Sequence, residues 1–305
     1  SNVKYSRLCE EGLPDYKYSP KHYIGKYKAT IDRVENRLAS VCTTNFTVTE
    51  QEIFVRASGS FIKATSGGVS LGTKTVVEIS GYSPNAARYR GVVNDSSLDG
   101  ETNPASQNYS RNQLGRPVSN INRKTARQYA DNSDYLIRQY DSKKFLNYLI
   151  WNEYATRNLQ QPINNVLTPE GYKQGGLGWG ATVYPDYNSY EAFFSPQGGN
   201  AVIPAGVCNT LGTKSGEVYF LLKNVPVAST GSGASIVYTE FADVYIPVNK
   251  YRGIEDIYGQ LYEIVDNIDT KITNLGGGVK RNEYWYQPDP YLTNDTAIKT
   301  GYKLI

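Results

Sequence analysis

The stretch YRGIEDIYGQLYEIVDNI, residues 251–268, contains glycine, aromatic and acidic residues in a specific order. A generic amphipathic strand would not need this order. The residues that carry this order are Gly253, Gly259, Tyr262, Glu263 and Asp266. Such a pattern serves either the active site of an enzyme or the scaffold behind a recognition surface. The rest of the sequence has to decide between these two classes.

The length and the net charge of the chain limit the classes of protein to which it can belong. A chain of 305 residues has room for two or three compact units. Its apolar runs fall short of the ~20 residues that cross a bilayer. The first residues, SNVKYSRLCE, contain no apolar signal core, so we expect synthesis in a cytosol and no membrane insertion. The net charge of +3 gives no general reason to expect nucleic acid as a partner.

Cysteine and histidine are too sparse for most metal and thiol chemistry. Cys9, Cys42 and Cys208 lie far apart, so no disulfide framework or CxxC motif can be written, and we expect free structural thiols. His22 is the only histidine, which excludes His-rich metal sites. We expect no cofactor. The segment DNID, residues 266–269, has too few ligands for an EF-hand loop, and calcium there stays an open alternative.

Tyrosine is far more frequent than the other aromatic residues, with 27 Tyr against 8 Phe and 3 Trp. A tyrosine offers a broad apolar face, a polar tip and little entropy to lose, which suits recognition surfaces and subunit contacts. The alternative is that these tyrosines are half-buried in strands.

The first part of the chain predicts an arm and a small β unit. Residues 1–45 are basic and Tyr-rich, and we expect them to attach to a partner protein instead of packing wholly on their own domain. Stacking of residues 16–28 on bases is the weaker alternative. The spacing of Ile31, Val34 and Leu38 predicts a short helix. Residues 46–93 alternate as strands broken by glycine, and the polar residues 94–115 form a linker.

Residues 116–305 predict an α+β domain. Asn122 caps a helix that carries Ala126, Tyr129 and Ala130, and Asp141 caps a second one. We expect the second helix to bury Phe145, Leu149 and the residues from Trp151 to Tyr154. Short strands are expected within residues 201–207, 217–224 and 235–248.

Three blocks in order, RPVSNINRKTARQYADN, FLNYLIWNEYATRN and YGQLYEIVDNI, resemble those of the formylglycine-generating-enzyme-like group within the C-type-lectin-like fold. The match covers residues 116 to about 270. The stretch RGIEDIYGQLY, residues 252–262, is more similar to a version found in structural proteins of phages that infect Bacteroides-type gut bacteria. The resemblance implies a domain of two helices on short antiparallel sheets, preceded by the β unit and the arm.

The resemblance also implies scaffold roles for the opening stretch. Gly253 and Gly259 take turn conformations, and Tyr262 stands where the family has a core tryptophan. Glu263 and Asp266 tie loops to the core through hydrogen bonds. Trp151 and Glu153 belong to the second block, and we expect Trp151 and Tyr262 to be buried.

The enzyme interpretations are disfavoured. A formylglycine-type oxidase needs a reactive cysteine pair after the third block, and no cysteine follows Cys208. Carboxylates at Glu153, Glu255, Glu263 and Asp266 are interpreted as salt bridges and loop anchors rather than as a glycosidase pair. The segment GGLGWG, residues 175–180, lacks the context of a nucleotide-binding loop.

We therefore expect a non-enzymatic phage virion surface protein of the tail- or head-fibre type, made in the cytoplasm of the host bacterium and assembled as a homotrimer. It would be attached to other virion proteins by its arm and would bind a host surface glycan or protein. Flat contact faces in residues 171–194 would come from Tyr172, Trp179, Tyr184, Tyr187 and Tyr190. The alternatives are that this segment folds over its own core, and that the protein is a purely architectural decoration of the head or tail.

Overall fold

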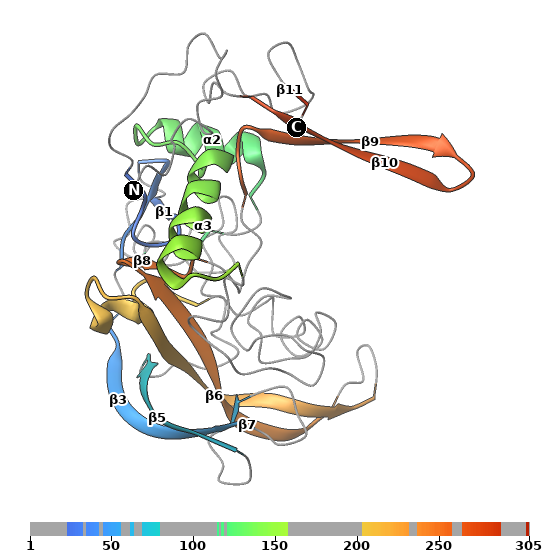
Figure 1. Cartoon of the computed structure of the whole chain (residues 1–305). Helices are drawn as coiled ribbons and strands as arrows, with labels where there is room; N and C mark the ends of the chain where they lie inside the picture. Colours follow the sequence, from blue (N-terminus) through green and yellow to red (C-terminus); the bar gives the residue numbers. More distant parts are fainter. Residues whose placement is uncertain are drawn as a thin grey trace. The chain divides into compact units, whose positions relative to one another are not determined.

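The computed structural model describes residues 23–32, 35–42, 45–55, 62–63, 69–79, 115, 117–118, 121–157, 203–231, 237–257, 264–287 and 303–304. Over these residues the protein is a mixed α/β structure in which most elements are strands and two are α-helices (Figure 1). The chain divides into two compact units. Unit 1 contains Ser1–Ile24, Asn122–Ala155 and Glu263–Ile305, and unit 2 contains Gly25–Ile121 and Thr156–Tyr262.

Unit 2 is built on one sheet with the strand order β4-β3-β5-β6-β7-β8. Its strands are β3 (Thr47–Val55), β4 (Ile62–Lys63), β5 (Val69–Glu78), β6 (Gly216–Thr230), β7 (Val237–Tyr251) and β8 (Ile254–Glu255). Neighbours are antiparallel except β5 and β6, which run parallel. Because β4 pairs with β7 as well as with β3, the strand pairings close into a ring.

The core of unit 2 lies where β5 meets β6. Val76 pairs with Tyr219 and Val77 with Phe220, and all four side chains are buried. Consecutive residues of a strand point to opposite faces, so both faces of the sheet are covered here, as is usual for parallel strands. Ile53, Val76, Tyr219, Leu221 and Tyr245 form one apolar cluster with Leu71 against it.

Residues 46–93 were expected to form a β unit separate from residues 116–305. Strands β3, β4 and β5 do form, but they share one sheet with β6, β7 and β8. The division by composition therefore does not coincide with the two compact units. The composition of a linker shows where the chain is polar, whereas strand pairing joins segments across any linker.

The helix expected around residues 30–41 is wrong. These residues form a hairpin of β1 (Thr30–Asp32) and β2 (Arg37–Ala39), in which Ile31 pairs with Leu38. Both side chains are buried. Their spacing in the sequence is compatible with one face of a helix, but it is also compatible with two positions that face each other across a hairpin. The turn contains Asn36 at a φ of 49°, which asparagine tolerates better than most residues.

The described part of the expected arm also packs within unit 2. The Lys26 carbonyl accepts a hydrogen bond from the Glu255 N–H, and the Ala29 carbonyl accepts one from the Val118 N–H. Thr30 and Ile31 are fully buried. The described residues of the arm from Gly25 onward thus pack within unit 2, whereas attachment of the arm to a partner stays a prediction. Residues 1–22, His22 among them, lie outside the described residues.

Unit 1 contains α2 (Arg123–Asp131), α3 (Tyr140–Tyr154), β9 (Ile268–Gly276), β10 (Val279–Tyr286) and β11 (Lys303–Leu304). Helix α2 follows the expectation. The Asn122 side chain accepts a hydrogen bond from the Thr125 N–H at 2.8 Å, and Ala126 and Ala130 are buried. The cap satisfies a backbone donor that has no partner inside the helix.

Helix α3 differs from the expectation in two respects. Its N-cap is Gln139 rather than Asp141. Its buried residues are Leu146 and Ile150, so the buried face is displaced by one position from the expected Phe145 and Leu149. Trp151, expected to be buried, is half-buried, and its ring meets that of Tyr148 edge-on with centroids 5.3 Å apart.

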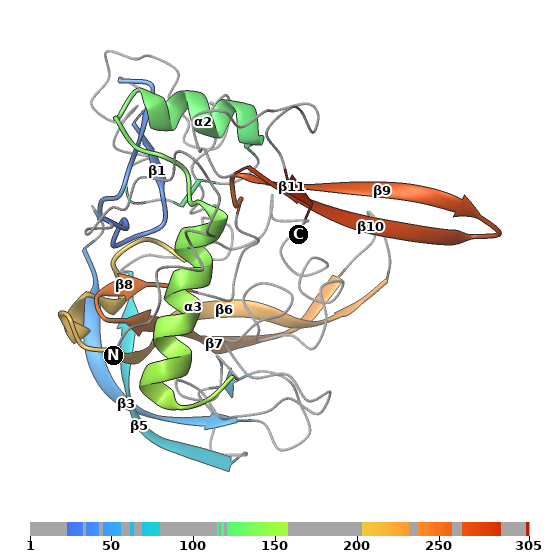
Figure 2. The same cartoon turned by 45° about the horizontal axis from the view of Figure 1, so that its top comes forward.

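Strands β9 and β10 form a long antiparallel hairpin that extends away from the helices of its own unit (Figures 1 and 2). The sheet order is β11-β10-β9, and β11 covers β10 only at Trp285 and Tyr286. Among the described strands, nothing else pairs with the outer edge of β10.

Strands expected within residues 217–224 and 235–248 are present in β6 and β7. The strand expected at 201–207 is wrong, because residues 203–206 are irregular and Val207–Leu211 form a 3-10 helix, η5. In the described part of the chain, no helix has the length and apolar character needed to cross a membrane.

Candidate functional site

The stretch 251–268 begins with a tight hairpin turn. Tyr251 at the end of β7 pairs with Ile254 at the start of β8, leaving Arg252 and Gly253 as the two turn residues. Their φ angles are 46° and 88°, the two positive values of a type I′ turn. Gly253 therefore has the turn conformation expected for it. The turn brings Glu255 back against β7.

Glu255 is a buried carboxylate that holds a loop. Its Oε1 accepts a hydrogen bond from the Gly206 N–H and its Oε2 accepts one from the Cys208 N–H, both at 2.7 Å. Burial raises the pKa of Glu255 to about 7, and these two hydrogen bonds oppose the shift because they favour the charged form. The side chain anchors the start of η5, which is why residues 203–207 are not a strand.

Lys250 completes this anchor from the adjacent position on β7. Its side chain is fully buried, and its Nζ donates a hydrogen bond to the Cys208 carbonyl at 2.9 Å. Burial lowers the pKa of Lys250, and the nearby Lys26 acts in the same direction. We refer to Lys250, Glu255, Gly206 and Cys208 as the β7–η5 anchor.

The anchor has no reactive thiol. Cys208 is fully buried, and its Sγ lies 3.4 Å from the Val248 carbonyl oxygen. Burial and the nearby Glu255 carboxylate raise the pKa of Cys208 well above its ordinary value, so the thiol stays protonated. Cys42 and Cys208 are both free thiols, as expected, and Cys9 lies outside the described residues.

Asp256 and Asn249 extend the hydrogen bonds of the anchor. Asn249 is buried, and its Oδ1 accepts a hydrogen bond from the Ile257 N–H at 3.0 Å. The Asp256 carboxylate lies 3.5 Å from Lys28 Nζ, which also donates to the Asp256 carbonyl. The segment that precedes β1 is thus held to the end of β8 by an ion pair and by hydrogen bonds.

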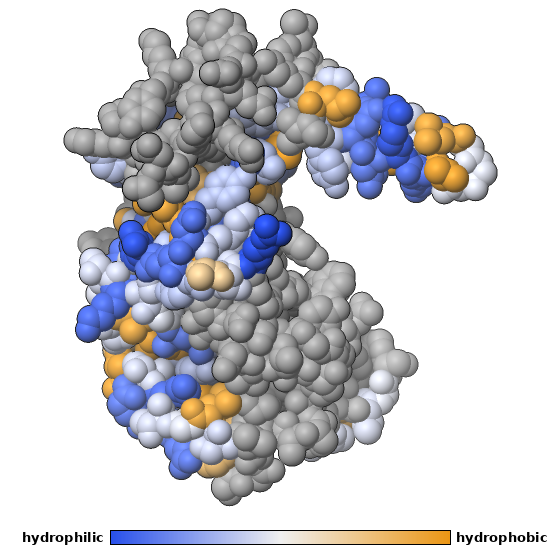
Figure 3. Space-filling model, viewed as in Figure 1, coloured by the Kyte–Doolittle hydropathy of each residue, from blue (hydrophilic) through white to orange (hydrophobic). Residues whose placement is uncertain are grey.

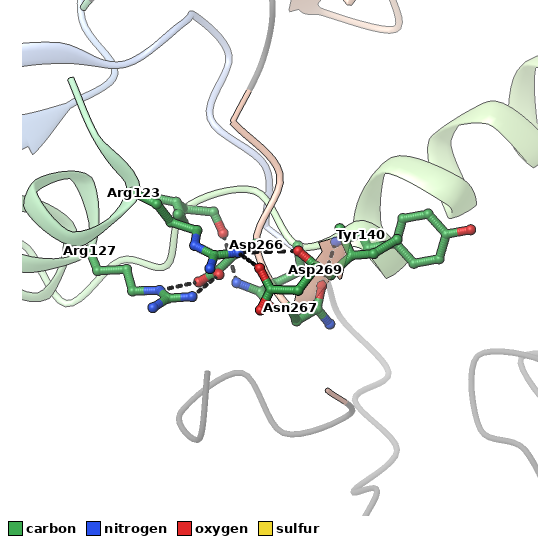
Figure 4. Close-up of polar contacts among 9 residues, drawn as sticks. Arg123, Arg127, Tyr140, Asp266, Asn267 and Asp269 are labelled. Carbon is green, nitrogen blue, oxygen red and sulfur yellow. Dashed lines mark hydrogen bonds and ion pairs between the residues drawn. The ribbon is translucent and has the colours of Figure 1, made fainter. Parts of the chain in front are cut away.

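The other end of the stretch supplies a second buried carboxylate, in unit 1. Asp266 accepts two hydrogen bonds from the Arg127 guanidinium, one of them from Nε at 2.8 Å (Figure 4). Arg123 lies beside it, 2.6 Å from the Asp269 carboxylate. We refer to Arg123, Arg127, Asp266 and Asp269 as the α2 clamp.

The α2 clamp joins helix and hairpin, and its chemistry is that of ion pairs. A guanidinium binds a carboxylate through two parallel hydrogen bonds, which fixes orientation as well as charge. Both carboxylates of the segment DNID are therefore engaged by arginine. Among the described residues, no group of three or more His, Cys, Asp or Glu side chains is placed to hold a metal ion.

Asn267, between the two clamp carboxylates, caps helix α3. Its Oδ1 accepts a hydrogen bond from the Tyr140 N–H at 2.8 Å, whereas Gln139 provides no side-chain cap (Figure 4). The Asp266 N–H donates to the Arg138 carbonyl at 2.8 Å. Asn267 has a φ of 55°, a conformation in which asparagine is enriched. This cap comes from far along the chain, so no local pattern could predict it.

The expected site residues fall into three groups. Glu255 and Asp266 make the hydrogen bonds of loop anchors, and Gly253 forms a turn. Glu153 is exposed on α3. The remaining residues lie outside the described part of the chain: Gly259, Tyr262, Glu263, Tyr172, Trp179, Tyr184, Tyr187 and Tyr190. Sequence reasoning missed Lys250, Arg127 and Asn267, because the groups that they bind lie far away along the sequence and no local pattern marks them.

The β9–β10 hairpin is the exposed counterpart of these buried anchors. Apolar side chains gather at its tip (Figure 3), where Leu275 and Val279 are 57% and 56% exposed. Ile272 and Tyr284, further along the ribbon, are 61% and 48% exposed. An apolar surface of this kind on a projecting element is typical of a protein–protein contact.

The two faces of the hairpin differ in charge. Cross-strand partners share a face, so Ile272 lies with Asn282, and Thr270 with Tyr284. The opposite face pairs Lys271 with Glu283 and Thr273 with Arg281. On this charged face the Arg281 and Glu283 side chains form an ion pair at 2.5 Å, and Trp285 Nε1 donates to Glu283 Oε2 at 3.3 Å.

Comparisons with protein-family models, with curated proteins and with solved structures found no match to this chain.

Proposed function

We propose that this chain is a non-enzymatic structural protein of a phage virion and that it works by binding other proteins. The β9–β10 hairpin carries this proposal. Ile272, Leu275 and Val279 are more than half exposed, and no strand among the described residues pairs with the outer edge of β10 before Trp285. An unpaired strand edge presents backbone N–H and C=O groups with which another chain can pair.

The buried acids support a binding role over an enzymatic one. Glu255 is 5% exposed and Asp266 is 2% exposed, and each accepts hydrogen bonds with both oxygens. A general acid or base has to reach the proton that it moves. These carboxylates instead hold η5 and α2, and a rigid scaffold of this kind suits a protein that presents a fixed surface.

We also propose that residues 116–305 follow the plan of the formylglycine-generating-enzyme-like group. The first block of the resemblance supplies α2 and the second supplies α3. The third block ends in Asp266 and Asn267, which bind Arg127 of the first block and cap α3. The bond between the third and first blocks, and the bond from the third block to the helix that contains most of the second, support a common scaffold.

The test of the virion proposal is the location of the protein. Antibodies raised against the purified full chain should label intact particles in immunogold electron microscopy of lysates from cells that carry the gene. Labelling should coincide with the head or the tail. Label confined to particle-free fractions, with the protein absent from purified particles by mass spectrometry, would overturn the proposal.

Adhesion to a host surface is the second candidate, favoured by the composition of residues 171–194. This segment contains five glycines and four tyrosines, and few charges intervene. The variant Tyr184→Ala/Tyr187→Ala should abolish attachment of particles to host cells while the far-UV circular dichroism stays unchanged. The matched control is Tyr135→Ala, whose side chain is 60% exposed and lies outside this segment and outside the arm. Normal attachment by the double variant would contradict adhesion through this segment.

A further inference from the structure

We propose that the outer edge of β10 binds the same edge of a second copy of this chain, antiparallel and centred on Asn282. This deepens the proposed function by naming a partner for the hairpin, and it rests on that function only for its biological setting. The pairing would extend over residues 280–284, because β11 already covers β10 at Trp285 and Tyr286.

Charge complementarity selects the second copy as the occupant. Two identical antiparallel strands pair about a two-fold axis, so a register centred on Asn282 places Arg281 opposite Glu283 of the other copy. The symmetry creates this contact twice. Opposite charges facing each other across strands are stabilising, and like charges are destabilising. Each Glu283 would then lie between its own Arg281, at 2.5 Å, and the Arg281 of the second copy.

Repulsion between like charges excludes the neighbouring registers. A register centred on Arg281 would face two arginines, and one centred on Glu283 would face two glutamates. Only the register centred on Asn282 removes both repulsions. It also places Lys280 opposite Tyr284 of the second copy, an arrangement in which an ammonium group can lie against an aromatic ring.

The edge of β9 offers a competing register, centred on Thr270, that would pair Lys271 with Asp269 of a second copy. That register is already blocked within the chain. The Arg123 guanidinium lies 2.6 Å from the Asp269 carboxylate and donates to the Ile268 carbonyl at 3.2 Å. The edge of β10 between the tip and Trp285 has no such occupant among the described residues.

The contact is small and therefore weak in dilute solution. A pair of short strands buries far less than the ~1,000 Å² of a stable interface. Copies fixed on one particle experience an effective concentration on the order of millimolar, at which a weak contact is populated. A two-fold contact makes a dimer of single chains, or joins two trimers if the chain also forms trimers.

Charge exchange tests the register. Sedimentation analysis of the full chain up to about 1 mM should show self-association of the natural sequence that weakens with added salt. Arg281→Glu and Glu283→Arg should each reduce it at least tenfold. An equimolar mixture of the two variants should restore it, because each edge then carries one sign of charge. The double variant Arg281→Glu/Glu283→Arg should restore it as well.

The matched control is Lys124→Glu, the same charge reversal at an exposed position of α2, which should leave self-association unchanged. A natural chain that stays monomeric at about 1 mM would overturn the proposal. Folded single variants that associate normally, or a mixture that does not associate, would overturn it too. None of these results bears on whether the protein is found on the virion, which the immunogold experiment decides.

Cross-linking keeps the proposal testable if a charge variant does not fold. Facing Cβ atoms of antiparallel strands lie ~4.5–5.5 Å apart, close to the distance that a disulfide spans. Asn282→Cys, treated with oxidised glutathione, should therefore give a covalent dimer above the background of the natural chain. Ile272→Cys, which is also exposed but lies on β9, should not. Equal cross-linking of both variants would show unspecific contact and overturn the register.

Discussion

At the scale of single residues, Glu255 shows how a carboxylate can be structural although its charge is unfavourable. The fold removes it from water, which raises its pKa to about 7, yet gives each oxygen a backbone N–H at 2.7 Å. The two hydrogen bonds position η5 against β7. Because burial disfavours the charged form of Glu255, the free energy of unfolding depends on pH.

The sign of that dependence follows from the two pKa values. Glu255 has an ordinary pKa of 4.5 and a folded pKa of about 7, so the folded state binds the proton more tightly. Its contribution to stability is fully present below pH 4.5 and is lost as the pH rises through 7. The free energy of unfolding should fall by up to about 3 kcal/mol over this interval on account of Glu255.

The variant Glu255→Gln checks this prediction, because the amide does not titrate. Urea unfolding between pH 4.5 and pH 7.5 should show a smaller slope of stability against pH than in the natural chain. The control Glu35→Gln, at an exposed position of the β1–β2 turn, should keep the natural slope. Equal slopes in all three proteins would show that Glu255 titrates as an ordinary acid.

Gly206 is the second residue whose role is determined by its surroundings. Its φ is +100°, and a Cβ built there would lie 2.1 Å from Cys42 Sγ. Gly206→Ala should destabilise unit 2 by roughly 2–5 kcal/mol, combining the conformational cost with overpacking. Gly72→Ala is the matched control, since Gly72 has a φ of +77° but open space around it, and should cost only ~1–2 kcal/mol. Adding Cys42→Ala to Gly206→Ala should recover part of the loss, and purely additive effects would contradict the clash.

At the scale of elements, α3 begins where another part of the chain caps it. Helix α2 carries its own cap at Asn122, so its start can be read from the sequence. Helix α3 is capped by Asn267, which directly precedes β9. The start of α3 and the base of the hairpin therefore depend on each other, together with the α2 clamp.

Two substitutions separate the cap of α3 from the backbone conformation of Asn267. Asn267→Gly removes the Oδ1 acceptor but keeps the φ of 55° accessible, and should cost about 0.5–2 kcal/mol. Asn267→Ala removes the acceptor and also strains the backbone, adding ~1–2 kcal/mol. Thermal unfolding followed by circular dichroism measures both. Equal stabilities of the two variants would mean that conformation contributes nothing at this position.

At the scale of the whole molecule, the two units differ in how much apolar surface they bury. Among the described residues, the buried apolar side chains of unit 1 are Ala126, Ala130, Leu146 and Ile150. Unit 2 buries large side chains such as Phe220, Tyr251 and Ile53 in and around its sheet. Because burial of apolar area drives folding, unit 1 should be the less stable of the two.

Differential scanning calorimetry should therefore show two transitions, with unit 1 unfolding at the lower temperature. Asn267→Gly should lower only the first transition, and Gly206→Ala only the second. Each variant serves as the control for the other. A single transition that both variants shift equally would show that the chain unfolds as one cooperative body.

The sequence by itself determined features whose causes are local. Asn122 followed by Ala126 and Ala130 is a complete helix signal, because the cap and the buried face lie within one segment. Alternating β-branched residues predicted β3, β5, β6 and β7, since strand preference is a property of neighbouring residues. Glycine at position 253 was expected in a turn, and the positive φ of that position is one that glycine adopts without strain.

Only the tertiary structure decided features whose partners lie far apart. Ile31 and Leu38 fit a helix and a hairpin equally by spacing, and burial of both in unit 2 selects the hairpin. Val207 and its neighbours read as a strand, but Glu255 takes the backbone N–H groups of Gly206 and Cys208 and turns the chain into η5. A hydrogen bond or ion pair joins whichever groups the packed chain brings within reach, and distance along the sequence carries no information about that proximity.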